Sequence, residues 1–230
     1  MNKLGKYEVR RELGKGAMGI VYEGFDPMIE RRVALKTILP QDISAQGMED
    51  ALARFKREAQ AAGRLNHPGI VAVYEYGEDI QADTGQKIAF IAMEFVQGRE
   101  LRGFFDDNQR FALPEIERIM REILQALGHA HAHGVVHRDM KPANLFVMAN
   151  GTIKIGDFGI ARIEASELTQ VGTIMGTPAY MSPEQIVGQP VDQRSDLFSC
   201  GVILYQLLTG ERPFTGGNST TLTYKVMNET

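Results

Sequence analysis

The hydrophobic residues of the first 97 positions gather in short runs that are typical of β-strands. Val, Ile, Tyr and Phe are frequent in five of these runs, at residues 7–13, 19–26, 31–39, 70–79 and 87–96. One longer segment, residues 48–65, has apolar residues at helical spacing, at Phe55, Ala59, Ala62 and Leu65. The pattern therefore predicts a small β-rich part that contains one main helix.

The pattern changes after Gln97-Gly98, where apolar positions recur with the period of a helix. Residues 113–134 predict a long helix, with Pro114 in its first turn and Gly134 at its end. A second apolar helix is predicted at residues 195–209. We therefore expect an α+β protein with two domains, residues 1–97 and 98–230, and a ligand bound between them.

The composition narrows the class of protein. With 230 residues, 43% of them hydrophobic, the chain can bury a core in one large domain or two small ones. A net charge of −4 gives no basic field, so no nucleic-acid partner is expected. The single cysteine, Cys200, suits a reducing compartment. The polar N-terminus predicts no signal peptide and the apolar run at 197–208 is too short to span a membrane, so we expect a cytoplasmic chain.

Gly14, Gly16 and Gly19 form a G-x-G-x-x-G pattern in the stretch LGKGAMGIVYEG. Two unrelated folds use this pattern, so alone it is a weak signal. The next residues, 20–23, favour a strand rather than the helix that a dinucleotide-binding fingerprint requires. We predict a hairpin whose glycines let backbone N–H groups approach phosphate oxygens, with a plain glycine hairpin as the alternative.

A strand lysine and a crowded polar segment are the other candidates for chemistry. Lys36, in VALK, is costly in an apolar strand without a partner, and Glu58 could supply one; a solvent-facing lysine is the alternative. Residues 135–146, VVHRDMKPANLF, place an acid, several bases and a carboxamide between two apolar ends. A turn alone has no need of these groups together, so we expect them to bind a common ligand.

Six motifs occur along the chain: GKGAMG, VALK, Glu58, HRDMKPAN, Asp157-Phe158-Gly159 and Ser182-Pro183-Glu184. In this order and spacing they resemble the eukaryotic-like (Hanks-type) Ser/Thr protein kinases, bacterial branch. The resemblance implies a bilobal kinase-like fold with a β-rich N-lobe, a hinge at residues 94–97 and a helical C-lobe. That C-lobe would continue beyond residue 230 in the family, so we expect a truncated C-lobe from a longer protein that could be membrane-anchored elsewhere.

The resemblance implies Mg²⁺-dependent transfer of a phosphoryl group from ATP to protein hydroxyls. Asp139 would orient the substrate hydroxyl, and Lys141 would neutralise charge on the transferred group. Lys36, paired with Glu58, would anchor the ATP phosphates. The implied magnesium ligands are Asn144 and Asp157. The other residues implied for ATP are Leu13, Gly14, Lys15, Gly16, Ala17, Met18, Gly19, Val21, Ala34, Met93, Glu94, Val96 and Phe146.

The same resemblance implies structural and regulatory roles. Arg138 would bind a phosphate on the segment after Gly159, and His137 would support Phe158 rather than act as a base. The implied phosphorylation sites are Thr173, Thr169 and Ser166. Thr177 together with Lys141 matches Ser/Thr specificity, and the remaining structural residues are Glu184 and Asp196.

Three functions remain open at this point. The preferred one is an active Ser/Thr protein kinase that phosphorylates its own activation loop in a bacterial signalling pathway. A nucleotide-binding pseudokinase or scaffold is the alternative. A small-molecule kinase is the third, although GTIMGTPAYMSPE, residues 172–184, argues against it because that segment forms a protein-substrate platform in the family. Expected partners are ATP, protein substrates and a second copy paired through the small lobes.

Three histidines near the end of the predicted helix at 113–134 resemble a metal cluster: His129, His131 and His133. A zinc site usually needs three or four ligands, and no fourth is evident nearby in the sequence. We interpret them as helix-end histidines.

Overall fold

The computed structural model describes residues 2–16, 19–38, 45–80, 85, 87–158 and 178–229. Several residues that the sequence singles out lie outside these ranges, namely Ala17, Met18, Gly159, Ser166, Thr169, Thr173 and Thr177. Backbone contacts divide the chain into two compact units. The first unit is formed by Met1–Asn66 and Val71–Gln97, and the second by His67–Ile70 and Gly98–Thr230.

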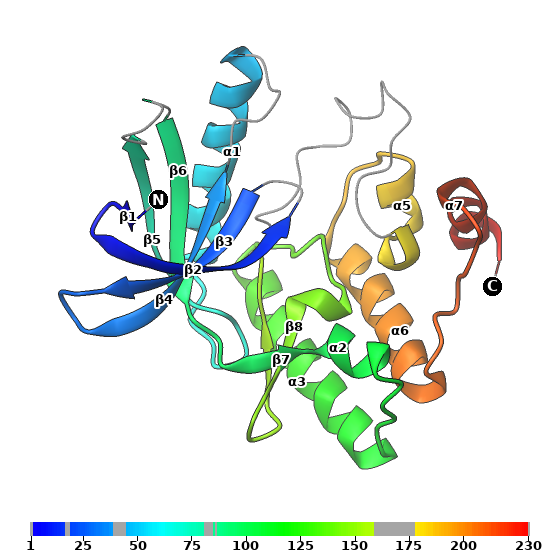
Figure 1. The fold of residues 1–230 in the computed structure, drawn as a ribbon. Coiled ribbons are helices and arrows are strands. Elements are labelled where there is room, and N and C mark those ends of the chain that lie inside the picture. The colour runs from blue at the N-terminus through cyan, green and yellow to red at the C-terminus, as the bar shows by residue number, and fades with distance from the viewer. Residues whose placement is uncertain are drawn as a thin grey trace. The chain divides into compact units, whose positions relative to one another are not determined.

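The first unit is an antiparallel sheet with one long helix, α1 (Ala45–Ala62) (Figure 1). Its strands follow the order β1-β2-β3-β4-β6-β5 across the sheet. Their bounds are Lys3–Leu4 for β1, Tyr7–Gly16 for β2, Gly19–Asp26 for β3, Arg31–Ile38 for β4, Val73–Ile80 for β5 and Lys87–Glu94 for β6. Neighbouring strands are mostly consecutive, which is the arrangement that hairpin connections produce.

One face of this sheet carries an apolar cluster. Its members alternate along the strands, as side chains of one face must: Leu4, Tyr7, Val33, Leu35, Ile88, Phe90 and Ala92. The rings of Tyr7 and Phe90 meet edge to face with centroids 6.0 Å apart. This packing buries one face of the central strands β4 and β6, and a slip of one residue would turn these side chains to the other face.

Helix α1 covers the opposite face. Residues directly opposite each other on antiparallel strands share a face, and the register pairs Lys36 with both Val21 and Ile91, and Ile91 with Tyr76. The ring of Phe55, from α1, lies 6.1 Å from that of Tyr76. Lys36 therefore projects from the face on which α1 packs.

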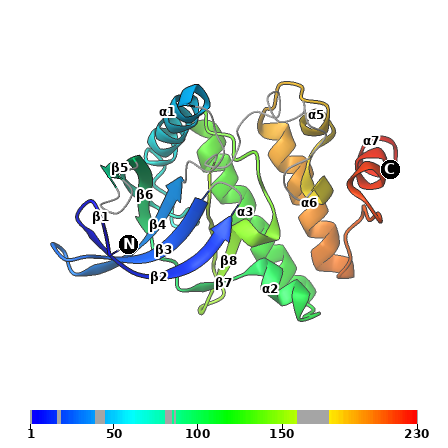
Figure 2. The same cartoon turned by 45° about the horizontal axis from the view of Figure 1, so that its top comes forward.

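The second unit combines a small sheet with helices (Figure 2). Strands β7 (Gly98–Glu100), β8 (Leu145–Met148) and β9 (Ile153–Ile155) form an antiparallel sheet in that order. The helices are α2 (Leu101–Asp106), α3 (Leu113–Ala132), α5 (Pro183–Ile186), α6 (Gln193–Thr209) and α7 (Ser219–Asn228). The described part of this unit also contains the short 3₁₀ turns η1 (Pro142–Asn144) and η3 (Pro178–Tyr180).

Helices α3 and α6 pack against each other to form the core of the second unit (Figures 1 and 2). Helix α3 buries one stripe at three- and four-residue spacing, formed by Ile116, Ile119, Met120, Ile123, Ala126, Leu127 and Ala130. It begins where the Glu115 carboxylate accepts a hydrogen bond from the Ala112 N–H at 2.9 Å, and it ends before Gly134, which has φ 73°. Helix α6 ends at Gly210, with φ 77°.

The α+β class predicted from the sequence, with a β-rich first part and a helical second part, is confirmed. The three-strand sheet of the second unit was not predicted. Strand β5 begins at Val73 rather than residue 70, because Ile70 instead forms a parallel bridge to Ile155 in the second unit. Within the ranges that the structure covers, no helix is long and apolar enough to cross a membrane.

Candidate active site

The polar segment after α3 is organised around a fully buried histidine. His137 donates from Nε2 to the Gly156 carbonyl oxygen at 2.9 Å, while its Nδ1 accepts the N–H of Asp139 at 3.2 Å. These partners fix the tautomer with the proton on Nε2. The ring packs against that of Phe158, with centroids 4.7 Å apart. Both ring nitrogens of His137 are therefore engaged in hydrogen bonds within the fold.

The Asp139 carboxylate lies between a cation and an amide. Lys141 Nζ donates to Asp139 Oδ2 at 2.6 Å. Asn144 Nδ2 donates to the Asp139 carbonyl oxygen at 2.8 Å and to its Oδ2 at 3.2 Å. The turn η1 places Asn144 there, and the bond to the Asp139 backbone fixes the loop around it. Three residues that the sequence nominated thus meet at one carboxylate, which keeps partial access to solvent.

Backbone pairing places Asp157 beside this loop. Leu145 pairs with Ile155 across β8 and β9, and the Gly156 N–H donates to the Asn144 carbonyl oxygen at 2.9 Å. Asp157 itself has φ 56°, a left-handed conformation that costs energy for a residue other than glycine. Such conformations cluster at functional sites, and this one lies two residues after the end of β9 at Ile155.

Negative charge gathers near Asp157. Partial burial raises the pKa of the Glu100 carboxyl. The nearby carboxylates of Asp157 and Asp106 raise it further, whereas Arg102 and Lys141 lower it. A cation bound there would relieve this repulsion. Asn144 uses its amide nitrogen on Asp139, so its amide oxygen is directed away from that residue. Asp157 and Asn144 can therefore offer the hard oxygen ligands that Mg²⁺ prefers.

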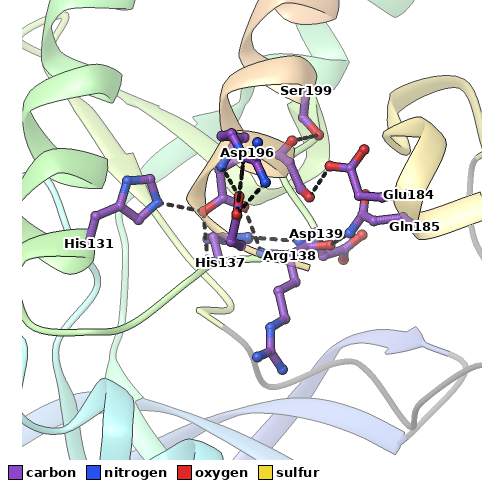
Figure 3. Close-up of polar contacts among 11 residues, drawn as sticks. His131, His137, Arg138, Asp139, Glu184, Gln185, Asp196 and Ser199 are labelled. Atoms are coloured by element: carbon purple, nitrogen blue, oxygen red, sulfur yellow. Dashed lines mark hydrogen bonds and ion pairs between the residues drawn. The ribbon is translucent and has the colours of Figure 1, made fainter. Parts of the chain in front are cut away.

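Asp196, near the start of α6, is 1% exposed and binds the loop that carries Asp139. Its Oδ2 accepts the His137 N–H at 2.9 Å and His131 Nε2 at 2.8 Å, and its Oδ1 accepts the Arg138 N–H at 2.8 Å (Figure 3). Arg138 has φ 66°, again left-handed. Its side chain extends away from Asp196 (Figure 3). Asp196 thus binds two backbone N–H groups of the loop that carries Asp139.

Helix α5 contributes a further pair of contacts. Gln185 donates from Nε2 to the Arg138 carbonyl oxygen at 2.7 Å. Glu184 is only half-buried, and its carboxylate accepts a hydrogen bond from the Ser195 hydroxyl (Figure 3). Burial would raise the pKa of Glu184, but its hydrogen bonds, led by that from Ser195, outweigh this effect and lower it. Ser195 thus gives Glu184 a partner within the second unit.

In the first unit, the glycine motif lies in the hairpin formed by β2 and β3, with Gly16 opposite Gly19. No helix follows, so the predicted hairpin is confirmed and a dinucleotide-binding turn is excluded. A Cβ on Gly19 would overlap the Thr37 carbonyl oxygen, so only glycine fits there. Leu13, Gly14 and Lys15 lie on the β2 side of this hairpin.

The remaining nucleotide candidates of the first unit gather on one face of its sheet. Register pairs Val21 with Lys36 and Ala34 with Met93, and Ala34 precedes Lys36 by two residues, so all four share a face. Helix α1, which carries a half-buried Glu58, packs on the same face. These positions suit a lysine that meets Glu58 and a ligand together.

The segment at the end of β6 supplies the last candidates of the first unit. The Glu94 N–H donates to the Ala72 carbonyl oxygen at 2.8 Å, so a ligand would have to use the Glu94 carbonyl. Val96 follows β6 in the half-buried stretch before Gln97. Phe146 belongs to β8 in the second unit, opposite Lys154 and Glu100.

The histidine-rich end of α3 has uses within the fold. His131 bonds to Asp196, and the His133 Nδ1 donates to the His129 carbonyl oxygen at 2.8 Å. The His129 ring packs between those of His67 and His133, at 5.2 Å and 4.4 Å. Across the described part of the chain, no group of three His, Cys, Asp or Glu side chains is arranged to hold a metal ion.

Sequence reasoning missed two residues of this site, His131 as a partner of Asp196 and Gln185 as a partner of Arg138. His131 was interpreted as one of three helix-end histidines, with no partner assigned to it. Gln185 follows a recognised motif, but nothing in the sequence alone says that its amide reaches a loop 47 residues earlier.

Comparison with known proteins decides the family. The family model described as protein kinase domain matches residues 7–230. The chain belongs to the protein kinase domain family. This confirms the predicted resemblance and the kinase-like fold.

This kinase domain is similar to several curated bacterial proteins. It is 43% identical over 231 residues to a probable serine/threonine-protein kinase of Streptomyces coelicolor. This alignment covers 98% of this chain and 33% of that protein. It is 38% identical to the probable serine/threonine-protein kinase PknB of Bifidobacterium longum, with the same two shares. The serine/threonine-protein kinase PknA of Mycobacterium tuberculosis is 38% identical, with 98% of this chain and 52% of that protein covered. The chain thus spans a third to a half of these relatives' length.

Proposed function

We propose that this kinase domain transfers the γ-phosphoryl group of ATP to Ser or Thr hydroxyls of proteins. The observation that carries the proposal is the Asp139 carboxylate, bonded to Lys141 and Asn144 in a loop that is anchored on buried Asp196. Phosphoryl transfer needs positioning and charge neutralisation more than covalent chemistry. The printed names of the similar bacterial proteins support the same activity.

The residues of the second unit divide the work. Asp139 orients the substrate hydroxyl and accepts its proton, and Lys141, 2.6 Å from it, meets the negative charge of the transferred group. Asn144 and Asp157 would hold Mg²⁺, which would supply positive charge to neutralise the phosphate oxygens. Phe146 contributes an apolar surface for the adenine.

The residues of the first unit bind the nucleotide. Lys36, paired with Glu58, contacts the phosphates, and the residues from Leu13 to Gly19 cover them with backbone N–H groups. Val21, Ala34 and Met93 line the adenine site from the shared sheet face, and the backbones of Glu94 and Val96 bond to its edge. In this proposal residues 1–97 are the N-lobe, with a hinge at 94–97, and residues 98–230 are the C-lobe.

Loss of the magnesium ligand tests the metal assignment. Asp157→Asn removes one ligand charge, so ATP binding should lose its dependence on magnesium and transfer should stop. Calorimetric titration of ATP at several magnesium concentrations measures this. An unchanged magnesium dependence would remove Asp157 from the metal site.

Regulation by phosphorylation is part of the proposal. Arg138 is exposed, and a guanidinium binds phosphate bidentately. A phosphate on Thr173, Thr169 or Ser166 would add about −1.5 to −2 charges for it to bind. The double variant Thr169→Ala, Thr173→Ala should lose autophosphorylation and activity. Full activity, with no phosphate on either threonine by mass spectrometry, contradicts this part.

The partners follow from the same reading. Protein substrates with Ser or Thr are expected because Lys141 and Thr177 occur together, and two copies are expected to pair through their N-lobes. A cytoplasmic site of action, in a bacterial signalling pathway, fits the ATP requirement and the lone, buried Cys200.

The experiment that tests the activity is transfer of labelled phosphate from ATP by the wild type and by Asp139→Asn. Label on protein Ser or Thr that depends on Asp139 supports the proposal. Nucleotide binding without transfer would instead indicate a pseudokinase or scaffold, and label only on small molecules would indicate a small-molecule kinase.

A further inference from the structure

We infer that Gln185 is a positioning residue for residues 137–144, which carry Asp139 and are called the catalytic loop below, and that it acts on Asp139 through the backbone of Arg138. The inference rests on the proposed kinase function. Gln185 is 4% exposed, and its Nε2 donates to the Arg138 carbonyl oxygen at 2.7 Å. Arg138 directly precedes Asp139, so the peptide group that bears this carbonyl also carries the Asp139 N–H.

The backbone at Arg138 needs to be held. Its φ of 66° is left-handed, which an arginine adopts only when its surroundings enforce it. Asp196 Oδ1 accepts a hydrogen bond from the Arg138 N–H at 2.8 Å, and Gln185 Nε2 donates one to the Arg138 carbonyl oxygen. One residue is thus clamped at both of its peptide groups, from α6 on one side and from α5 on the other (Figure 3).

A capping role alone does not explain the amide. Gln185 Oε1 accepts the Ser182 N–H at 3.0 Å, which caps the start of α5. Glutamate at the same position caps a helix start equally well. Only the bond to the Arg138 carbonyl requires a donor, and a carboxylate has none. A glutamate at position 185 would therefore keep the capping role but lose the hydrogen bond to Arg138.

This difference between the two roles defines the test. Gln185→Glu keeps the cap on Ser182 but replaces the donor at Arg138 with a charged oxygen that faces a carbonyl oxygen. The matched control is Gln189→Glu, the same chemical change at an exposed position four residues later. Gln185→Met, which cannot bond at either position, is the second variant.

We expect Gln185→Glu to lower kcat about tenfold to a hundredfold, because a buried acceptor is left unpaired next to Asp139. The KM for ATP should stay close to that of the wild type. The melting temperature should fall in both Gln185→Glu and Gln185→Met, because each leaves the buried Arg138 carbonyl without a donor. The relative kcat should recover as the pH falls from 8 to 6, because a protonated carboxyl regains a donor. Gln185→Met should show no such recovery, and Gln189→Glu should behave as wild type.

Hydrogen exchange of the Arg138 and Asp139 amides gives a readout that needs no turnover. Exchange at these amides should be faster in Gln185→Glu than in wild type or Gln189→Glu. Wild-type exchange and kcat in Gln185→Glu would overturn the inference and leave Gln185 as a cap. If the wild type transfers no phosphate, the proposed function fails instead, and the exchange rates alone decide whether Gln185 holds the loop.

Discussion

The substitution Asp196→Asn tests how much the stability of the fold depends on the hydrogen bonds that Asp196 accepts from the loop that carries Asp139. It changes one oxygen of a buried carboxylate into an NH₂ group and keeps the side chain's size. The carboxylate accepts three hydrogen bonds, two from the N–H groups of His137 and Arg138 and one from His131. An amide accepts on one side only.

The magnitude follows from what is left unpaired. If the NH₂ group replaces Oδ1, it faces the Arg138 N–H, and donor meets donor. If it replaces Oδ2, the His137 N–H loses its acceptor, although His131 could accept through its other tautomer. Either way one buried backbone N–H is orphaned, at a cost of about 1–3 kcal/mol, and the remaining bonds lose the strength of a charged acceptor. We expect the free energy of unfolding to fall by about 2–4 kcal/mol.

Chemical denaturation of wild type and Asp196→Asn measures this difference. Asp192→Asn, at the exposed N-cap of the same helix, is the control, because asparagine caps helices as well as aspartate does. The variant's kcat should fall with its stability, since Arg138 would no longer be held at φ 66°. An unfolding free energy within about 0.5 kcal/mol of wild type would refute the reasoning, because surface substitutions change stability by no more than that.

Three further predictions concern other parts of the chain. Lys36→Met should abolish phosphoryl transfer with little loss of stability, whereas the control Lys87→Met, on β6, should keep the activity. If Lys36→Met kept a tenth of wild-type turnover in an assay with labelled ATP, Lys36 would not belong to the site. Gly210→Ala should lower the free energy of unfolding by about 1–2 kcal/mol, because Gly210 is left-handed and a Cβ would overlap the Arg110 guanidinium. Gly201→Ala, at an open position within α6, should raise the free energy of unfolding by about 0.5–1 kcal/mol. Chemical denaturation that gave the same change for both glycine variants would contradict this prediction. Burial raises the pKa of the Cys200 thiol to about 12, so at pH 8 it should stay protonated and react with a thiol reagent only after denaturation; fast native-state labelling would be the opposite result.

The sequence predicted an element most accurately where the spacing of its apolar residues and the residues that begin or end it indicated the same bounds. The helix at 113–134 was predicted within two residues of α3 because its apolar stripe, Pro114 and Gly134 all point to the same bounds. The strand around Lys36 was predicted at residues 31–39 because this run is rich in β-forming residues, and the structure places it at Arg31–Ile38. The glycine hairpin followed from the β-forming residues after Gly19.

Other features could not be predicted, because they depend on contacts between distant segments. Strands β8 and β9 have four and three residues, too few to show a period, and they form through pairing with each other and with β7. Residues 67–70 belong to the second unit because Ile70 bridges to Ile155 and the Ile155 N–H bonds to Gly69. The partnership of Gln185 with Arg138 likewise joins residues far apart in the chain.

The central claim is that Asp139, held by Lys141 and Asn144, makes this chain a protein kinase. Transfer of labelled phosphate from ATP, measured on wild type and Asp139→Asn at equal fold content, tests it most directly. The account predicts label on Ser or Thr of protein for the wild type and a loss of about a hundredfold or more in the variant, since positioned proton transfer contributes about that much. Equal labelling by the two proteins would contradict it.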